Sequence, residues 1–143
     1  MRLRTFGLLA ATGTCVLSAP LAERAFGAIT REQAEALLTL NDGFTFNSRK
    51  RIVELASRNR LPAMYERKEF VDEGGLISYG PHVADMWRRA ATYVDKILKG
   101  TKPADLPVEQ PMRFELVINM KTATTLRLTI PQAIFFRTDH IIQ

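Results

Sequence analysis

The sequence predicts an α/β fold, in which a parallel sheet has helices on both faces. Short apolar runs that do not alternate with polar residues lie between segments with helical periodicity, as is typical of strands buried on both sides. The length of 143 residues is that of one domain with a real core. The expected strands are 36–40, 62–65, 76–79 and 113–120. The first has an alternative, a helix that starts at the capping-box pattern of Thr30 and Gln33 and continues through Leu40.

Helices are expected over about 47–59, 67–73 and 83–98. The third ends before Gly100, where a left-handed cap costs a glycine little. Its apolar residues share one face, which predicts that the helix packs against the sheet and buries Trp87 in the core. The residues of this face are Val83, Met86, Trp87, Ala90, Val94 and Ile97.

A tether marked by prolines follows the third helix. Pro103, Pro107 and Pro111 each fix φ and favour extended backbone in the preceding residue, so the stretch is predicted to be extended rather than helical. The strand after the tether alternates, which predicts one wetter face. Its apolar side consists of Phe114, Leu116 and Ile118. Short helices are expected near Lys121 and after Pro131.

The first 27 residues have the layout of a secretory signal peptide. Two arginines precede an apolar run from Phe6 to Leu17, and Ala25-Phe26-Gly27 offers a cleavage site with small residues just before Ala28. The apolar run is shorter than the about 20 residues that span a bilayer. The alternative is an ordinary helix over 21–33, with one apolar face made of Ala22, Ala25, Phe26 and Ile29.

Composition and motifs exclude several classes of function. The net charge of +5 is spread along the chain, and the tightest basic run, 49–51, has no interleaved aromatic residues, so nucleic acid is not an expected partner. A single cysteine allows no internal disulfide, and His82 and His140 stand alone, so no metal site is expected. The sequence contains no nucleophile motif, phosphate loop or zinc-protease motif, which indicates a protein that is not an enzyme and needs no cofactor.

Two long stretches resemble one family. The stretch RRAATYVDKILKGTKPADLPVEQPMRFELVINMKTATTLRLTIP (88–131) is very similar to the C-terminal part of ABC transporter substrate-binding proteins, in the group related to tryptophan- and tyrosine-binding proteins. The stretch RIVELASRNRLPAMYERKEFVDEGGLISYGP (51–81) fits the same proteins, and the resemblance covers about residues 30–143. The resemblance implies a Rossmann-like lobe of a type I periplasmic binding protein, which closes by a hinge around a solute.

What the resemblance implies for function is the binding of a solute for import. The solute would be an amino acid or a similar small organic molecule, the protein partner an ABC permease, and the location the periplasm. Family members carry a first lobe ahead of this region, so residues 28–143 are interpreted as a C-terminal lobe in truncated form. The alternative is a non-binding remnant or an interaction module, and the apolar side of strand 113–120 is expected to cause self-association.

Candidate binding residues follow from where strands end, because open α/β sheets bind ligands beyond the carboxyl ends of their strands. These residues are Asn41 and Asp42, Tyr65 and Glu66, and Ser78, Tyr79 and Gly80. We expect Tyr79 to stack on the solute, and Ser78 and the backbone of Gly80 to hydrogen-bond a carboxylate. The helix that begins near His82 directs its positive end at the same place. The alternatives are that Asn41 and Asp42 only form a turn and that Tyr79 only packs.

Two positions depart from the pattern of the family. Arg127 stands where the family usually has glycine, and a left-handed cap there would cost arginine about 1–2 kcal/mol. His82 stands where the family tends to asparagine, and a lone histidine at a helix start is usually solvated or bound to a local partner.

Overall fold

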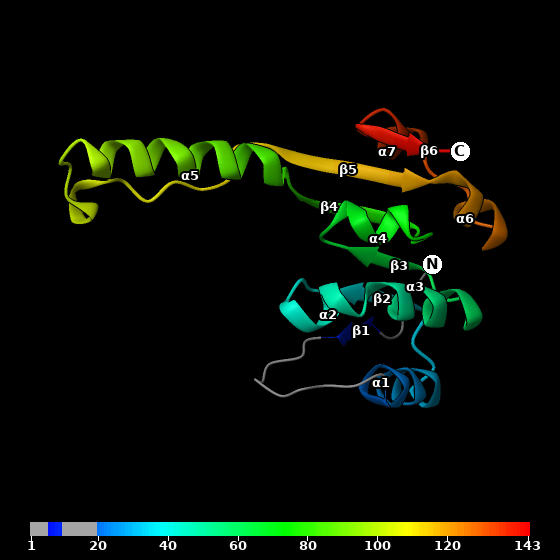
Figure 1. Cartoon of the computed structure of the whole chain (residues 1–143). Coiled ribbons are helices and arrows are strands. Elements are labelled where there is room, and N and C mark those ends of the chain that lie inside the picture. The colour runs from blue at the N-terminus through cyan, green and yellow to red at the C-terminus, as the bar shows by residue number, and fades with distance from the viewer. Residues whose placement is uncertain (1–5, 10–19) are drawn as a thin grey trace.

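The computed structural model describes residues 6–9 and 20–143 and shows a mixed α/β fold (Figure 1). Six strands form one sheet in the order β1-β2-β3-β4-β5-β6. β1 to β4 are parallel, β5 runs antiparallel to β4, and β6 is parallel to β5. The strands are β1 (Phe6–Leu9), β2 (Ala36–Thr39), β3 (Ala63–Tyr65), β4 (Ile77–Pro81), β5 (Phe114–Asn119) and β6 (His140–Ile142). The predicted α/β class is therefore confirmed.

Helices connect the strands. They are α1 (Pro20–Arg31), α2 (Gly43–Asn47), α3 (Arg49–Arg58), α4 (Lys68–Asp72), α5 (Val83–Leu98), α6 (Met120–Thr125) and α7 (Gln132–Phe135). The alternative of a helix through Leu40 is wrong, because α1 ends at Arg31 and 36–39 pair in the sheet. A 3-10 turn at Pro103–Asp105 interrupts the tether, which was predicted to be extended throughout; a proline at the first position of a turn is compatible with helical backbone.

The core lies between one face of the sheet and helices α1, α3 and α4. Alternate residues of a strand point to opposite faces, and here Leu37, Ala63 and Tyr65 are buried while Leu38 and Met64 are half-buried. The largest buried side chains meet in a stack of Tyr65 on Phe70, with ring centroids 4.7 Å apart. The cluster consists of Ala22, Phe26, Leu37, Ile52, Val53, Leu55, Ala56, Leu61, Ala63, Tyr65 and Phe70.

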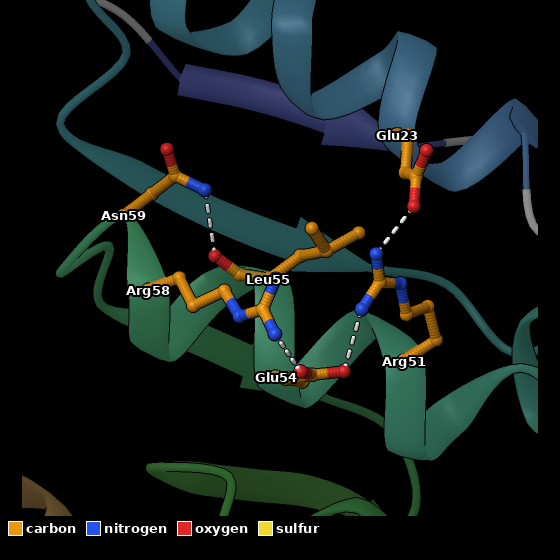
Figure 2. Close-up of polar contacts among 6 residues, drawn as sticks. All are labelled: Glu23, Arg51, Glu54, Leu55, Arg58 and Asn59. Carbon is orange, nitrogen blue, oxygen red and sulfur yellow. Dashed lines mark hydrogen bonds and ion pairs between the residues drawn. The ribbon is translucent and has the colours of Figure 1, made fainter.

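Helix α1 belongs to this core. Ala22 and Phe26 are only 1% and 3% exposed, and Glu23 forms an ion pair with Arg51 of α3 (Figure 2). Arg51 also donates to Glu54 at 2.7 Å, so one guanidinium connects the two helices. The helix predicted as the alternative to a signal peptide is thus present over most of its length. Residues 1–5 and 10–19 of the predicted signal lie outside the described residues.

Helix α5 does not pack against the sheet, and the predicted burial of Trp87 is wrong. Figure 1 shows α5 standing away from the sheet with the tether folded back along it. All of α5 is described and none of its residues is buried; Trp87 is 72% exposed. Amphipathic periodicity identifies the apolar face of a helix but not the surface that covers it. The tether holds this helix instead, through a 2.6 Å hydrogen bond from the Tyr93 hydroxyl to the Pro107 carbonyl and an ion pair between Arg89 and Glu109.

Replacing Trp87 by alanine is expected to lower the free energy of unfolding by less than about 0.5 kcal/mol, because substitutions at exposed positions rarely cost more. Phe70→Ala serves as the buried comparison and is expected to cost about 3–5 kcal/mol. Urea denaturation of dilute protein measures both. A loss for Trp87→Ala that matches the loss for Phe70→Ala would show that α5 packs on the body of the protein.

The two remaining expectations concern β5 and the chain after it. The predicted wetter face of β5 is wrong, because Glu115, Val117 and Asn119 on that side are all buried. On the side predicted to be apolar, Ile118 is fully buried, Leu116 is half-buried, and Phe114 is 45% exposed and stacks on Tyr79. Arg127 has φ of 56°, so it adopts the left-handed conformation that the sequence comparison pointed to. It follows the end of α6, where the next amide, that of Leu128, donates to the Ala123 carbonyl at 2.9 Å.

Candidate functional site

A hollow of about 310 Å³ lies where β3 and β4 end and α5 begins. We call it the carboxyl-end hollow. It is lined by Glu66, Arg67, Lys68, Glu69, Ser78, Gly80, Pro81, His82, Val83, Ala84, Trp87 and Glu115. A second hollow of about 360 Å³ adjoins it, shares five of these residues, and adds Asn41, Met86 and Ala90. The two together form a groove along the carboxyl edge of the parallel strands, where α/β sheets bind ligands.

Gly80 allows the two strand ends to approach each other. A Cβ atom added at Gly80 would lie 1.8 Å from the carbonyl oxygen of Glu66, far inside any permitted contact. Only glycine leaves room for the backbone after β3 to run this close to β4. Because of this contact, Glu66 and Arg67 are placed beside the first turn of α5 rather than at a distance from it.

The end of β2 joins the same edge through one hydrogen bond. The amide of Asn41 donates to the Glu66 carboxylate at 3.0 Å, so the predicted residues Asn41 and Glu66 do come together. Asp42 has another task, since its carboxylate accepts from the Thr45 amide at 2.7 Å and caps α2. The Asp42 amide in turn donates to the Thr45 hydroxyl at 2.9 Å, which completes a capping box. Asp42 therefore starts a helix, which neither the binding role nor the alternative of a simple turn predicted.

Neighbouring residues of one strand are divided between the two faces of the sheet. Ser78 is 1% exposed and lines the carboxyl-end hollow together with Gly80. Tyr79 points the other way, is 44% exposed, and stacks on Phe114 with centroids 5.4 Å apart. Tyr65 is enclosed in the core, and its burial raises the pKa of the phenol well above the ordinary value. The structure thus brings together Asn41, Glu66, Ser78 and Gly80, and places Tyr65, Tyr79 and Asp42 elsewhere.

Both signs of charge are present at the hollow. Arg67 donates to Glu69, with Nε 3.1 Å from Oε2, and this hydrogen bond raises the pKa of the guanidinium. Burial alone would raise the pKa of Glu69, but Arg67 holds it below its ordinary value. The guanidinium carbon of Arg67 also lies 4.9 Å from the centroid of the Phe46 ring, which fixes its plane. This guanidinium already binds the Glu69 carboxylate through both Nε and Nη2, so a second carboxylate would bind through its remaining N–H groups.

The start of α5 supplies a further cluster. His82 Nδ1 lies 3.0 Å from Asp85 Oδ2, and Asp85 also pairs with Arg88 and, at 3.8 Å, with Arg113. Loss of solvent would raise the pKa of Asp85, but its neighbours His82, Arg88 and Arg113 lower it overall. His82 is thus held by a local partner, as the departure from the family pattern suggested. The His82 amide donates to the Arg113 carbonyl at 2.9 Å. The segment that leads into α5 therefore lies beside the segment that leads out of the tether.

Sequence reasoning missed Arg67, Trp87 and Glu115 as residues of the hollow. Arg67 directly follows a predicted site residue, so a rule that extends one residue beyond each strand end would have found it. Trp87 lies one turn into the helix whose start was identified, but its apolar neighbours suggested core. Glu115 comes from β5, opposite Gly80, and its position depends on the antiparallel register of β4 and β5. No group of three or more potential metal ligands occurs among residues 6–9 and 20–143.

The comparison with protein families shows to which family this chain belongs. The model of the family described as ABC transporter substrate binding protein matches residues 23–142, which is most of the chain. The chain belongs to this family. No curated protein shows a significant match to the chain.

Solved structures of substrate-binding proteins have the same fold. A conserved domain protein from Vibrio cholerae is similar with a TM-score of 0.80 and 26% identity, over 88% of this chain and 42% of its own. The ABC domain from Streptococcus pneumoniae in complex with L-Trp is similar with a TM-score of 0.79 and 25% identity, over 87% of this chain and 43% of its own. A substrate binding protein with adhesive properties from Clostridium difficile was solved in a ligand-free, open structure. It is similar with a TM-score of 0.62 and 16% identity, over 90% of this chain and 42% of its own, which shows the fold alone.

This chain therefore spans less than half the length of the solved structures that it matches. Among the described residues, no helix has the length and apolar character needed to cross a membrane.

Proposed function

We propose that this member of the family is a solute-binding component of an ABC-type import system and that the carboxyl-end hollow is one wall of its solute cleft. The observation that carries the proposal is the convergence at one edge of the sheet of Arg67, Glu66 and the first turn of α5. Polar groups of both signs next to apolar surface are the usual lining of a small-molecule site. The division into a leader over 1–27 and a lobe over 28–143 stays a prediction from the sequence, and the burial of Ala22 and Phe26 in the core counts against it.

The solute that fits this wall is an amino acid or a similar small organic zwitterion. Arg67 and the amides at the start of α5 suit a carboxylate, because a helix N-terminus carries partial positive charge. Glu66 suits an ammonium group, although its carboxylate already accepts from Asn41. Trp87 is 72% exposed beside both and offers an aromatic surface to an apolar or aromatic side chain. The Streptococcus pneumoniae domain that this chain resembles was solved with L-Trp, which supports the same class of solute.

The remaining parts of the proposal come from the family. An ABC permease is the expected protein partner, and the periplasm is the expected location. A second candidate function, an interaction module that binds no solute, is favoured by the exposed apolar side chains of α5. Solute titration of the chain by itself distinguishes the two.

Titration calorimetry of the full chain with L-tryptophan, other amino acids and aromatic acids is expected to show saturable binding of at least one of them. Arg67→Gln is expected to weaken that binding about tenfold or more, because a charge-assisted hydrogen bond to a carboxylate is worth about 1.5–3 kcal/mol. The matched control is Arg58→Gln, which removes an equally long cation that pairs with Glu54 on α3, away from the hollow.

Circular dichroism confirms that both variants are folded before they are titrated. Absence of binding by the folded chain for every solute would reject the solute-binding proposal and favour the interaction module. Equal weakening by Arg67→Gln and Arg58→Gln would place the solute elsewhere on the surface.

A further inference from the structure

One carboxylate of the carboxyl-end hollow, that of Glu115, is almost completely buried. Its side chain is 10% exposed, whereas the side chain of Glu69, another carboxylate of the hollow, is 33% exposed. Glu115 lies on β5 directly opposite Gly80 of β4. Its side chain therefore points to the same face of the sheet as that of Ser78, two residues before Gly80. Because burial of a charged group is costly without compensating partners, the partners of Glu115 show what this carboxylate can bind.

The described chain compensates the charge of Glu115 only weakly. Among residues 6–9 and 20–143, its one ion-pair contact is with His140 of β6, whose Nε2 lies 3.2 Å from Oε1. The side chain of His140 is 65% exposed, so water screens this contact, and the imidazole carries a charge only when it is protonated. No lysine or arginine of the described residues lies within ion-pair distance of Glu115. Its carboxylate can therefore accept a further cationic partner.

The other two carboxylates of the hollow are already engaged by groups of the same chain. Glu69 binds the Arg67 guanidinium, with Oε2 3.1 Å from Nε. Glu66 accepts a hydrogen bond from the Asn41 amide at 3.0 Å. Of the three carboxylates in the lining, that of Glu115 is thus both the most buried and the one with the weakest partner.

The hydroxyl of Ser78 is a second polar group without a partner on the same face. Ser78 is 1% exposed and lines the hollow, and its hydroxyl forms no hydrogen bond with another residue that the structure describes. Buried hydroxyls are nearly always hydrogen-bonded, so an unpaired one beside a cavity indicates that the cavity supplies the partner. Ser78 lies opposite Val117, two residues along β5 from Glu115, which makes Ser78 and Glu115 diagonal neighbours on one face.

We propose that Glu115 and Ser78 form an ammonium subsite in the carboxyl-end hollow, so that the solute is an amino acid rather than a plain carboxylic acid. This inference rests on the proposed solute binding and makes it more specific. An ammonium group has three N–H donors and no acceptor, and the Glu115 carboxylate and the Ser78 hydroxyl both offer acceptor oxygens. A hydrogen bond between two charged groups is among the strongest in proteins. Arg67 and the first turn of α5 then remain for the solute carboxylate.

The subsite predicts a specificity that can be measured. An acid that lacks the ammonium group would displace water from Glu115 and Ser78 without giving them a partner. Sites with buried polar groups reject analogues that cannot pair with those groups. Amino acids should therefore bind more tightly than the corresponding acids, although the acids have the same carboxylate and the same apolar side chain.

Titration calorimetry of the full chain compares an amino acid with its analogue in which hydrogen replaces the ammonium group, such as indole-3-propionate for L-tryptophan. The amino acid is expected to bind about tenfold more tightly or better, because it gains a charge-assisted hydrogen bond. Glu115→Gln is expected to weaken binding of the amino acid about tenfold or more and to leave binding of the analogue no weaker than in the full chain. Ser78→Ala is expected to weaken binding of the amino acid alone.

Two control variants separate recognition of the solute from a structural role. Glu54→Gln makes the same change at an exposed carboxylate of α3, away from the hollow, and is expected to leave both affinities unchanged. His140→Gln removes the contact of Glu115 with β6 and is expected to keep the preference for the amino acid. If Glu115 only holds β6 in place, His140→Gln and Glu115→Gln should have the same effect, which would overturn the proposal. Circular dichroism checks that each variant folds.

The unmodified chain gives a result even if Glu115→Gln does not fold. Equal affinity for the amino acid and its analogue would overturn the ammonium subsite and leave the solute-binding proposal standing. Absence of binding for both would reject solute binding and the subsite with it. Loss of the preference in Glu66→Gln but not in Glu115→Gln would also overturn the proposal, because Glu66 would then bind the ammonium group.

Discussion

Gly80→Ala is expected to destabilise the protein by about 4 kcal/mol or more, which only a few kinds of substitution do. The added Cβ atom would lie 1.8 Å from the Glu66 carbonyl oxygen, and the atom it meets is backbone, which cannot rotate away. The ends of β3 and β4 would have to separate, next to the register in which Tyr65 pairs with Ser78. The same movement would open the carboxyl-end hollow, so any solute binding should be lost with the stability.

Gly27→Ala is the matched control for this substitution. Gly27 lies in α1, and nothing lies within 4 Å of the position that its Cβ would take. Alanine is the better helix former by about 1 kcal/mol, so this variant is expected to be slightly more stable than the parent chain. Urea denaturation at equal protein concentration compares the three proteins. If Gly80→Ala costs less than about 1 kcal/mol, the close approach of Glu66 to β4 does not exist as described.

Much of the sheet could be predicted from the sequence because each short apolar run is bounded by turn residues. The runs 36–40, 62–65, 76–79 and 113–120 became β2 to β5, with ends that shift by no more than two residues. β6 was missed, since its three residues are mostly exposed and no apolar pattern marks them. α2 was missed for a similar reason: it has five residues, and it depends on the capping box of Asp42 and Thr45, whose sequence signature is also that of a turn.

The candidate site could be predicted in part. The rule that ligands bind at carboxyl ends of strands found Asn41, Glu66 and the stretch around Ser78, because parallel strands end at a common edge. The same rule could not separate Ser78 from Tyr79, since it identifies a strand end but not which alternate side chain faces the hollow. The burial of Tyr65 depends on its stack with Phe70, a contact that appears only when α4 folds over β3.

The position of α5 could not be predicted, for a physical reason that Trp87 illustrates. The helix has a strongly amphipathic sequence, and in most single domains such a face lies on the core. Here the tether returns along α5 and β5 pairs with β4, so the chain leaves the sheet and comes back without laying the helix on it. A periodic pattern contains no information on whether its partner surface lies in the same chain.

A chain that begins at Ala28 is expected to be less stable than the full chain by about 4 kcal/mol or more. The deletion removes β1 from the edge of the sheet and most of α1, including Phe26, which is 3% exposed, and Ala22, which is 1% exposed. Loss of one buried phenylalanine side chain costs about 3–5 kcal/mol by itself. The ion pair from Glu23 to Arg51 is lost as well, but its exposed position makes that contribution small (Figure 2).

Comparison of the two chains separates the roles that the sequence offers for residues 1–27. A removable leader would contribute nothing to the folded protein, so the chain from Ala28 would then be as stable as the full chain, and Phe26→Ala in the full chain would cost nothing. If α1 is part of the core, both changes lower the denaturation midpoint, and Phe26→Ala accounts for most of the loss. N-terminal sequencing of protein exported by a bacterium completes the comparison. A stable product that starts at Ala28 would show that the core is stable without α1. The core residues of α3, which are Ile52, Leu55 and Ala56, would then not need to pack against that helix.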